Sequence, residues 1–254
     1  MKRTAMLSVL PALAMLACSD STGLGSEPGV SLSFATRAPG VNAAPGFFAS
    51  VQSDTLMDEQ NTLIITSAEI VLREIELKRV EIEDCDSASE DDSCEEFETG
   101  PILLSLPLDG STATEVTIPV EVGVYDELEF DIHKVSNDDP EDAEFRAAYP
   151  DMVGKSMRIQ GTFNGTAFTY ETDLDVEQEF DLVPALTIDD TVTETNVTVR
   201  LNLSMWFRDG TGALVNPELG NKGGQYESLI KENIKQNIEA FEDHDRDGDD
   251  SDES

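Results

Sequence analysis

The sequence predicts an all-β fold, a β-sandwich of roughly nine strands with one short helix and a C-terminal helix. Throughout residues 29–217, hydrophobic residues alternate with polar residues in short segments, which is typical of strands that bury one face. Turn-forming residues separate these segments, and Asn164-Gly165 is the strongest hairpin signal among them. A long helical spacing occurs only within residues 218–241, so the pattern favours a sandwich over alternating strands and helices.

The predicted strands of the first half follow from this alternation. Gly29–Thr36 is a strand, whereas residues 37–54 contain Pro-Gly pairs and are expected to form a loop. Thr62–Glu83 is a long strand in which the buried phase changes at Lys78-Arg79, so a β-bulge is expected there. The remaining strands of this half are Pro101–Pro107, Thr114–Val122 and Tyr125–Val135.

The second half opens with a helix signal. Asp139-Pro140-Glu141-Asp142 predicts a short helix with Asp139 as its N-cap, and this helix should end before Pro150. The longest alternation, from Val197 to Met205, predicts a central strand with one solvated face that ends at Trp206-Phe207. The other strands of this half are Ser156–Phe163, Ala167–Asp173 and Gln178–Val183.

The hydrophobic period changes after the predicted sandwich domain of residues 29–217. Within residues 218–241, one face of a helix is expected to carry Tyr226, Ile230, Ile234, Ile238 and Phe241. Residues 242–254 follow as an acidic tail.

The N-terminus has the pattern of an export signal. Lys2 and Arg3 precede a short apolar run, so residues 1–17 are interpreted as a signal peptide. The run is shorter than the roughly 20 apolar residues that span a bilayer, and Pro11 interrupts it. Its end, Met15-Leu16-Ala17-Cys18, resembles the lipobox of bacterial lipoproteins.

The lipobox resemblance implies that Cys18 is acylated and becomes the first residue of the mature chain. Residues 18–28 would then form a lipidated, flexible tether between the membrane and the domain. In the lipoproteins that this end resembles, an aspartate directly after the cysteine tends to retain the protein at the inner membrane. Here Ser19 follows the cysteine and Asp20 comes one place later, so the resemblance implies the outer membrane. The alternative is an ordinary signal peptide in which the cysteine stands by chance.

The chain is strongly acidic, with 53 acidic against 16 basic residues and a net charge of −37. Nucleic acid is therefore not an expected partner, because phosphate binding requires the opposite charge. Cations are the expected counter-charges. Adaptation to a salty environment would produce the same composition, and composition does not separate these two explanations.

Cys85 and Cys94 remain once Cys18 is assigned to lipid, and such a pair in an exported chain predicts a disulfide. Two free thiols or a metal-binding pair are the alternatives, although no nearby histidine or further cysteine supports a metal. The disulfide would close the tip of residues 83–98, which carries nine acidic residues and no basic residue. This tip is interpreted as a solvated hairpin end or, alternatively, as a cation site.

The acidic tail contains a candidate calcium site. Asp243, Asp245 and Asp247 precede Gly248 at the spacing of the first half of an EF-hand loop, and Asp249 is a fourth candidate ligand. The predicted helix would lead into this loop, whereas the bidentate glutamate of the twelfth loop position is missing. The alternative is a disordered acidic tail.

No catalytic residues are expected. The sequence contains no nucleophile elbow, phosphate-binding loop or zinc-protease motif. Of the two histidines, His133 is expected on the protein surface, and His244 lies in the acidic tail. Acidic residues are too abundant for a glycosidase pair to be singled out.

Three segments carry a resemblance to a known family. AEIVLREIELKRVEIE, GPILLSLPLDG and VGVYDELEFDIHKV are similar to segments of the bacterial lipoproteins grouped as domain of unknown function 4382, over residues 63–207. The Gly-x-Tyr pattern of that group is present as Gly123-Val124-Tyr125. The family has no established catalytic residues, so the resemblance implies none here. Neither the Cys85–Cys94 insert nor the acidic tail belongs to its general pattern.

These features together predict a lipid-anchored outer-membrane protein with a non-enzymatic binding or adhesive role, stabilised by calcium. Besides the membrane, the expected partner is a surface glycan or another protein. A fimbrial-type subunit or assembly anchor is the alternative, and an exposed unpaired edge strand would favour it. A carbohydrate-active enzyme is a further alternative, which a groove with two facing carboxylates would favour.

Overall fold

A computed structural model of the chain describes residues 28–36, 53–80, 100–189 and 194–248. Several predictions from the sequence fall outside these ranges. They are the signal peptide, Cys18 with its tether up to residue 27, the Cys85–Cys94 pair with its acidic tip, most of the loop of residues 37–54, and Asp249.

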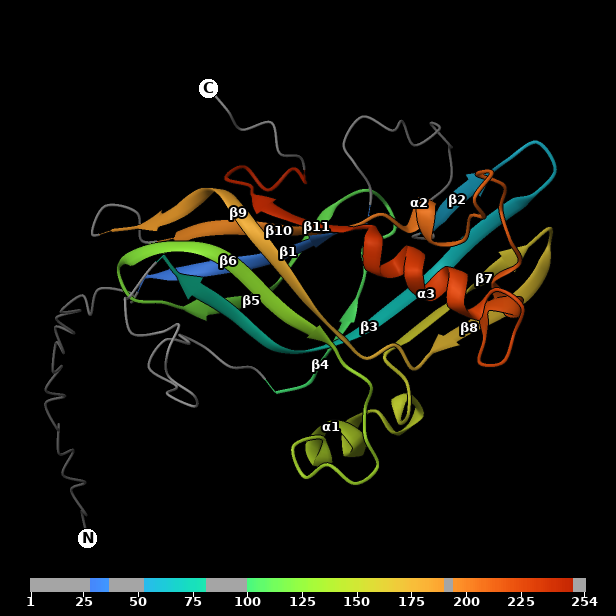
Figure 1. Cartoon of the computed structure of the whole chain (residues 1–254), viewed down its shortest axis with the longest axis horizontal. Coiled ribbons are helices and arrows are strands. Elements are labelled where there is room, and N and C mark those ends of the chain that lie inside the picture. The colour runs from blue at the N-terminus through green and yellow to red at the C-terminus, as the bar shows by residue number, and fades with distance from the viewer. Residues whose placement is uncertain (1–27, 37–52, 81–99, 190–193, 249–254) are drawn as a thin grey trace, which may run out of the picture.

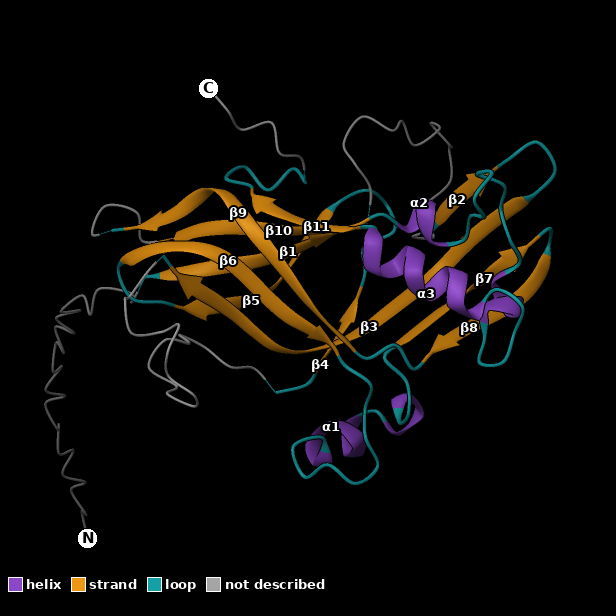
Figure 2. Ribbon diagram, in the orientation of Figure 1, coloured by secondary structure: helices purple, strands orange, loops and turns teal. Residues whose placement is uncertain are grey.

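Two β-sheets form the body of the molecule, which confirms the predicted all-β sandwich (Figures 1 and 2). The smaller sheet has the order β11-β10-β1-β5, with bounds Ile238–Glu242, Glu194–Leu201, Gly29–Ala35 and Thr112–Pro119. The larger sheet has the order β8-β7-β3-β6-β9, with bounds Thr166–Thr172, Met157–Phe163, Thr62–Arg79, Gly123–Ile132 and Val176–Ile188. The short strands β2 (Asp54–Met57) and β4 (Ile102–Ser105) also pair with β3.

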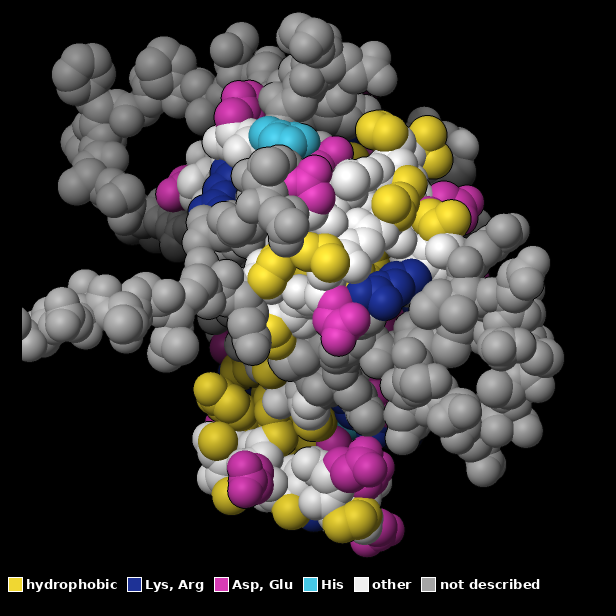
Figure 3. Space-filling model, turned by 90° about the vertical axis from the view of Figure 1, so that its left-hand side faces the viewer, with side chains coloured by type: hydrophobic (Ala, Val, Ile, Leu, Met, Phe, Trp, Pro, Cys, Tyr) yellow, Lys and Arg dark blue, Asp and Glu magenta, His cyan; other side chains and the backbone are white. Residues whose placement is uncertain are grey.

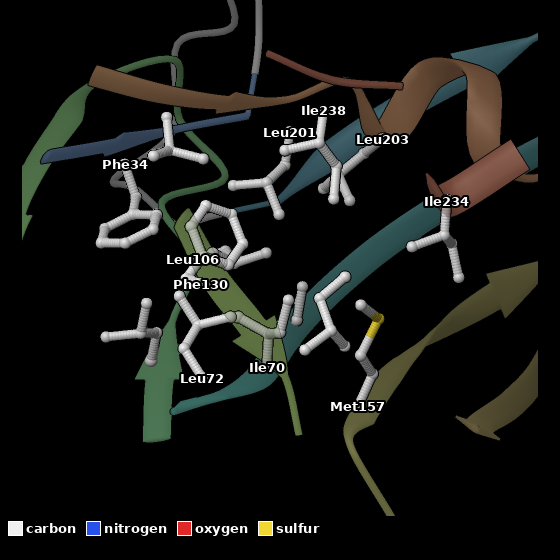
Figure 4. Close-up of a cluster of buried hydrophobic side chains, with 14 of the residues drawn as sticks. Phe34, Ile70, Leu72, Leu106, Phe130, Met157, Leu201, Leu203, Ile234 and Ile238 are labelled. Atoms are coloured by element: carbon white, nitrogen blue, oxygen red, sulfur yellow. The ribbon is translucent and has the colours of Figure 1, made fainter. Parts of the chain in front are cut away.

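The hydrophobic core lies between the two sheets, and the alternating residues of the sequence supply it (Figure 4). Phe34 of β1 and Leu201 of β10 come from the smaller sheet, and Leu72 of β3 and Phe130 of β6 come from the larger sheet. These side chains are 2% exposed or less. Burial of this apolar surface, at roughly 25 cal/mol per Å², is what holds the two layers together.

Several local predictions are confirmed. Asn164 and Gly165 have φ values of 51° and 79° and join β7 to β8 in a tight hairpin. The pairing of β3 with β6 shifts register between Lys78 and Arg79, where the sequence predicts a bulge. A second shift lies between Arg73 and Glu76, and it was not expected from the sequence.

The short helix α1 (Ala143–Ala148) ends before Pro150, as predicted, but its N-cap position is Asp142 and not Asp139. The Asp142 side chain makes no capping hydrogen bond; its carboxylate lies against His133 Nε2 and accepts a hydrogen bond from the Ser136 N–H. A 3₁₀ helix, η2, follows at Pro150–Met152.

The strand predicted from Val197 to Met205 is shorter than expected. β10 ends at Leu201, and Leu203–Trp206 form the one-turn helix α2. Trp206 and Phe207 are fully buried in the core. Part of the face of β10 expected to be solvated is also buried: Asn196 and Thr198 are 1% and 0% exposed, whereas Arg200 remains partly exposed.

The C-terminal helix prediction is wrong in its boundaries. After the 3₁₀ helix η3 (Pro217–Gly220), helix α3 covers only Glu227–Gln236, and Ile238 and Phe241 belong to strand β11. Ile230 and Ile234 of α3 are buried, as the helical spacing indicates. Ile238 keeps its place in the core by pairing with Leu201 of β10, where strand hydrogen bonds replace the helical ones.

Within the described part of the chain, none of these helices has both the length and the apolar character needed to cross a membrane.

Candidate metal site at the C-terminal loop

The loop after β11 is held against the smaller sheet by backbone contacts. The Asp243 N–H donates to the Asn196 carbonyl at 2.9 Å, and the Asn196 side-chain amide donates to the Asp243 carbonyl at 3.1 Å. The loop then turns sharply, because Arg246 and Gly248 have φ values of 60° and 84°. These contacts place residues 243–248 over the outer face of β10 and β1.

Asp243 is the buried centre of this loop, with 0% of its surface exposed. Its Oδ2 accepts hydrogen bonds from the Thr198 hydroxyl at 2.7 Å and from the Gly248 N–H at 3.0 Å. Its Oδ1 accepts a longer bond from the Asp247 N–H at 3.2 Å. Among the described residues, no lysine, arginine or histidine forms an ion pair with Asp243.

Asp245 and Asp247 are exposed and complete the carboxylate cluster. One oxygen of each of the three aspartates lies within 4.8 Å of the others. Two oxygens that bind one calcium ion can be up to about 5 Å apart, because each lies 2.3–2.6 Å from the ion. The three carboxylates therefore have a spacing that one calcium ion could bridge after small side-chain rotations.

A network of buried polar side chains supports the loop from below. The Ser33 hydroxyl of β1 donates to the Asn196 side-chain carbonyl at 2.6 Å and lies 2.8 Å from the Thr114 hydroxyl of β5. The Asn196 amide also donates to the Thr198 hydroxyl at 3.0 Å. The network connects three strands to Asp243 and was missed by the sequence analysis. Its only signal was the run of Ser, Thr and Asn on faces expected to be solvated.

Two further contacts fix the path of the loop. A Cβ atom at Gly248 would lie 3.0 Å from the Thr112 hydroxyl and 3.3 Å from the Ala35 side chain. Arg200 donates to the Gly248 carbonyl at 3.2 Å, and its guanidinium lies 4.8 Å from the centre of the Phe241 ring. Gly248 is therefore required both for the turn and for close packing on the sheet.

The structure corrects how the loop is reached. The sequence suggested that a helix would lead into half of an EF-hand, whereas strand β11 ends at Glu242, immediately before Asp243. The loop is therefore attached to a strand of the smaller sheet and not to a helix.

A second acidic cluster lies on the outer face of the larger sheet, and the sequence analysis did not single it out. Three acidic pairs face each other across β6 and β9: Glu127–Asp181, Glu129–Glu179 and Asp131–Glu177. Lys78 of β3 forms ion pairs with Glu127 and Glu129. The hydrogen bond between Glu177 and Glu179 and the nearby charge of Glu129 raise the pKa of Glu177. One oxygen each from Glu129, Glu177 and Glu179 lies within 4.8 Å of the others.

His133 is buried, which contradicts the expected surface position. Its Nε2 lies 2.9 and 3.1 Å from the two carboxylate oxygens of Asp142, and its Nδ1 lies 3.8 Å from Asp175. β6 ends at Ile132, and the His133 N–H donates to the Val71 carbonyl, so the alternation of the strand no longer sets the direction of this side chain.

The class of protein is therefore a two-sheet β-sandwich. A C-terminal loop with three clustered aspartate carboxylates lies over its smaller sheet. No protein-family model matches the chain, and neither curated proteins nor solved structures yield a match.

Proposed function

We propose that the chain is a lipid-anchored, non-enzymatic binding protein of the outer membrane whose β-sandwich is stabilised by calcium at the C-terminal loop. Its partner would be a glycan or a protein at the cell surface. The N-terminal residues Lys2 to Cys18 support the anchor, and the three segments quoted above support a relationship with domain of unknown function 4382. A disulfide between Cys85 and Cys94 belongs to the same proposal, because the chain would be exported.

The observation that carries the calcium site is the environment of Asp243. Asp243 has no exposed surface and no cationic partner among the described residues; a buried carboxylate of this kind is costly, and such groups in proteins are paired with a cation or bind a metal. Two more carboxylates converge on it from residues 245 and 247. A calcium ion carries two positive charges, so it would offset most of the charge of the three carboxylates, and it would tie the loop to β10.

The surroundings of His133 argue against this ring as a general base. The imidazole is 5% exposed, and one of its nitrogens is engaged by the Asp142 carboxylate. A general base must reach the proton that it removes from a substrate, and this ring lies beneath the surface.

The calcium proposal is tested by thermal unfolding of the mature domain. Calcium at about 1 mM should raise the melting temperature more than sodium chloride of equal ionic strength, because extracellular sites bind with dissociation constants of about 0.1–1 mM. The double variant Asp245→Asn, Asp247→Asn should remove this difference and keep the fold. Both residues are exposed, so their replacement leaves the core intact.

A matched control is provided by two exposed aspartates outside the loop. Asp138→Asn with Asp151→Asn removes the same charge and should leave the calcium effect unchanged. Equal stabilisation by both salts in the parent protein, or an equal loss in both double variants, would show that the loop is only a solvated acidic end.

A further inference from the structure

One end of the sandwich exposes a group of valines. Val80, Val122 and Val124 are 40%, 52% and 40% exposed. They are neighbours in space, because the Val80 N–H donates to the Val124 carbonyl and Arg79 donates to the Val122 carbonyl. Figure 3 faces this end of the molecule and shows exposed hydrophobic side chains across it. We call Val80, Val122 and Val124 the valine end.

The first described residue of the chain lies beside the valine end. The Pro28 carbonyl accepts a hydrogen bond from the Val120 N–H at 3.0 Å, and Gly29 pairs with Pro119. Val122 follows only two residues after Val120. Figure 1 shows the ends of β3 and β5 and the beginnings of β1 and β6 together at the left of the molecule. The segment that leads to Cys18 therefore joins the domain at this same end.

The tether is short enough to keep this end close to a bilayer. Pro28 lies ten positions after Cys18. A flexible chain of that length has a root-mean-square extension of about 18 Å, and at full extension it reaches about 35 Å. A tether in this range gives the domain a local concentration near the membrane in the millimolar range, so a weak contact is enough to orient it.

Among the residues that the structure describes, the charges next to the valines form a neutral pair, which suits a lipid surface without net charge. Glu121 lies beside the valines, and Arg79 neutralises it through an ion pair of 3.2 Å. The Arg79 guanidinium also lies 5.6 Å from the centre of the Tyr125 ring, which holds it in place. Because the whole chain carries a charge of −37, an anionic membrane would repel it.

We propose that the valine end rests on the neutral phospholipid surface of the bilayer that holds the acyl anchor. This inference rests on the lipid anchor of the proposed function. The opposite end of the molecule, with the β7–β8 hairpin and the start of β3, then points away from the membrane and is presented to a partner (Figure 1).

The test uses tryptophan fluorescence in acylated protein reconstituted into phosphatidylcholine vesicles that contain spin-labelled phosphatidylcholine as a quencher. The native Trp206 is fully buried and serves as the same background in every variant. Val122→Trp places the probe at the valine end. Met57→Trp is the matched control: Met57 is 66% exposed and pairs with Thr62, at the opposite end of the 18-residue strand β3 from Arg79.

The labelled lipid should reduce the emission of Val122→Trp and leave that of Met57→Trp at the level of the parent protein. Adding Val124→Asp should restore the Val122→Trp emission, because a charge placed in the contact disfavours it. Equal quenching of both probes, or quenching of neither, overturns the proposed orientation. Stronger quenching of Val122→Trp in phosphatidylglycerol vesicles overturns the preference for a neutral surface.

Flotation of the vesicles separates this inference from the proposed function. Protein that floats with the vesicles through Cys18 but shows no quenching at residue 122 has its lipid anchor and lacks the proposed contact. Protein that does not float lacks the anchor, and both proposals are then wrong.

Discussion

At the scale of single residues, two polar side chains are buried although their sequence context suggests that they are exposed. Asp243 looks like one of many acidic residues in the tail, yet it is fully buried and accepts hydrogen bonds from Thr198 and Gly248. His133 follows a strand in the sequence, yet it lies against Asp142 below the surface. In both cases the neighbours come from distant parts of the chain or from a loop that folds back.

Glu177→Gln is expected to stabilise the protein at neutral pH. The pKa of Glu177 is raised, so at pH 7 the folded protein holds a carboxylate that would bind a proton more readily than the same group in the unfolded chain. This penalty is present above the folded-state pKa and disappears below the unfolded value, about pH 4. The melting temperature of Glu177→Gln should exceed that of the parent at pH 7 and approach it at about pH 3.5.

The control for this prediction is Glu59→Gln, an exposed residue outside the acidic rows of β6 and β9. It removes the same charge and should change the melting temperature less at pH 7. Identical gains in the two variants would mean that only the total charge of the molecule matters.

At the scale of elements, the C-terminal loop covers polar surface of the smaller sheet. Ser33, Asn196 and Thr198 are at most 1% exposed, although they point away from the hydrophobic core. These side chains form hydrogen bonds with one another, with Thr114 and with Asp243. The buried polar groups of the loop and of the sheet therefore serve as each other's hydrogen-bond partners.

Gly248→Ala is expected to loosen this loop. The alanine would have to adopt a φ value of 84°, and its Cβ would press on Thr112 and Ala35. A positive φ in a residue other than glycine costs about 1–2 kcal/mol, and the contact adds to that cost. Urea unfolding should show the loss of stability, and calcium should stabilise the variant less than the parent.

Gly154→Ala is a matched control, since Gly154 has a φ of 79° but open space around its Cβ position. It should lose stability from the backbone alone and keep the full calcium effect. If both variants respond to calcium as the parent does, packing of the loop on the sheet is not linked to the ion.

An exposed, unpaired edge strand would favour the fimbrial-type alternative, and β8 lies at an edge of the larger sheet. The Thr169 and Glu171 N–H groups donate to Glu218 and Asn221, and the Asn221 amide donates to the Thr169 carbonyl. Side chains of η3 and its C-cap thus occupy backbone groups that an added strand would need. Strand exchange of the fimbrial type would have to use another edge, such as that of β5.

At the scale of the whole molecule, β1 links the proposed anchor to the centre of the smaller sheet. It runs parallel to β10 and antiparallel to β5, and all seven of its residues are buried. The segment that would lead from the proposed anchor therefore enters the sandwich through a strand that is paired on both sides.

Cys18→Ala is expected to abolish acylation and membrane association. The small residue Ala17 and the short apolar run before the cysteine predict lipid attachment at this position. Labelling of expressing cells with radioactive palmitate, followed by membrane fractionation, measures both effects. Uptake of palmitate by the variant at the level of the parent would refute attachment at Cys18.

The alternation of hydrophobic residues was enough to determine the all-β class and the β3 bulge at Lys78-Arg79, and the turn residues Asn164-Gly165 were enough to determine the hairpin. These features depend on local steric preferences and on a period of two residues, both of which are written directly in neighbouring positions. The aspartate spacing likewise determined that residues 243, 245 and 247 can converge, because a short turn brings them together.

Only the tertiary structure decided the secondary structure of residues 238–242 and the burial of the polar face of β10. The spacing of Ile234, Ile238 and Phe241 suits a helix, but pairing with β10 draws residues 238–242 into a strand. The polar face of β10 suits solvent, but the C-terminal loop covers it and buries Asp243. Hydrogen bonds between segments far apart in the chain outweigh local preference here. The backbone groups at a strand edge and the polar side chains of a covered face need hydrogen-bond partners, and the fold decides which segments can supply them.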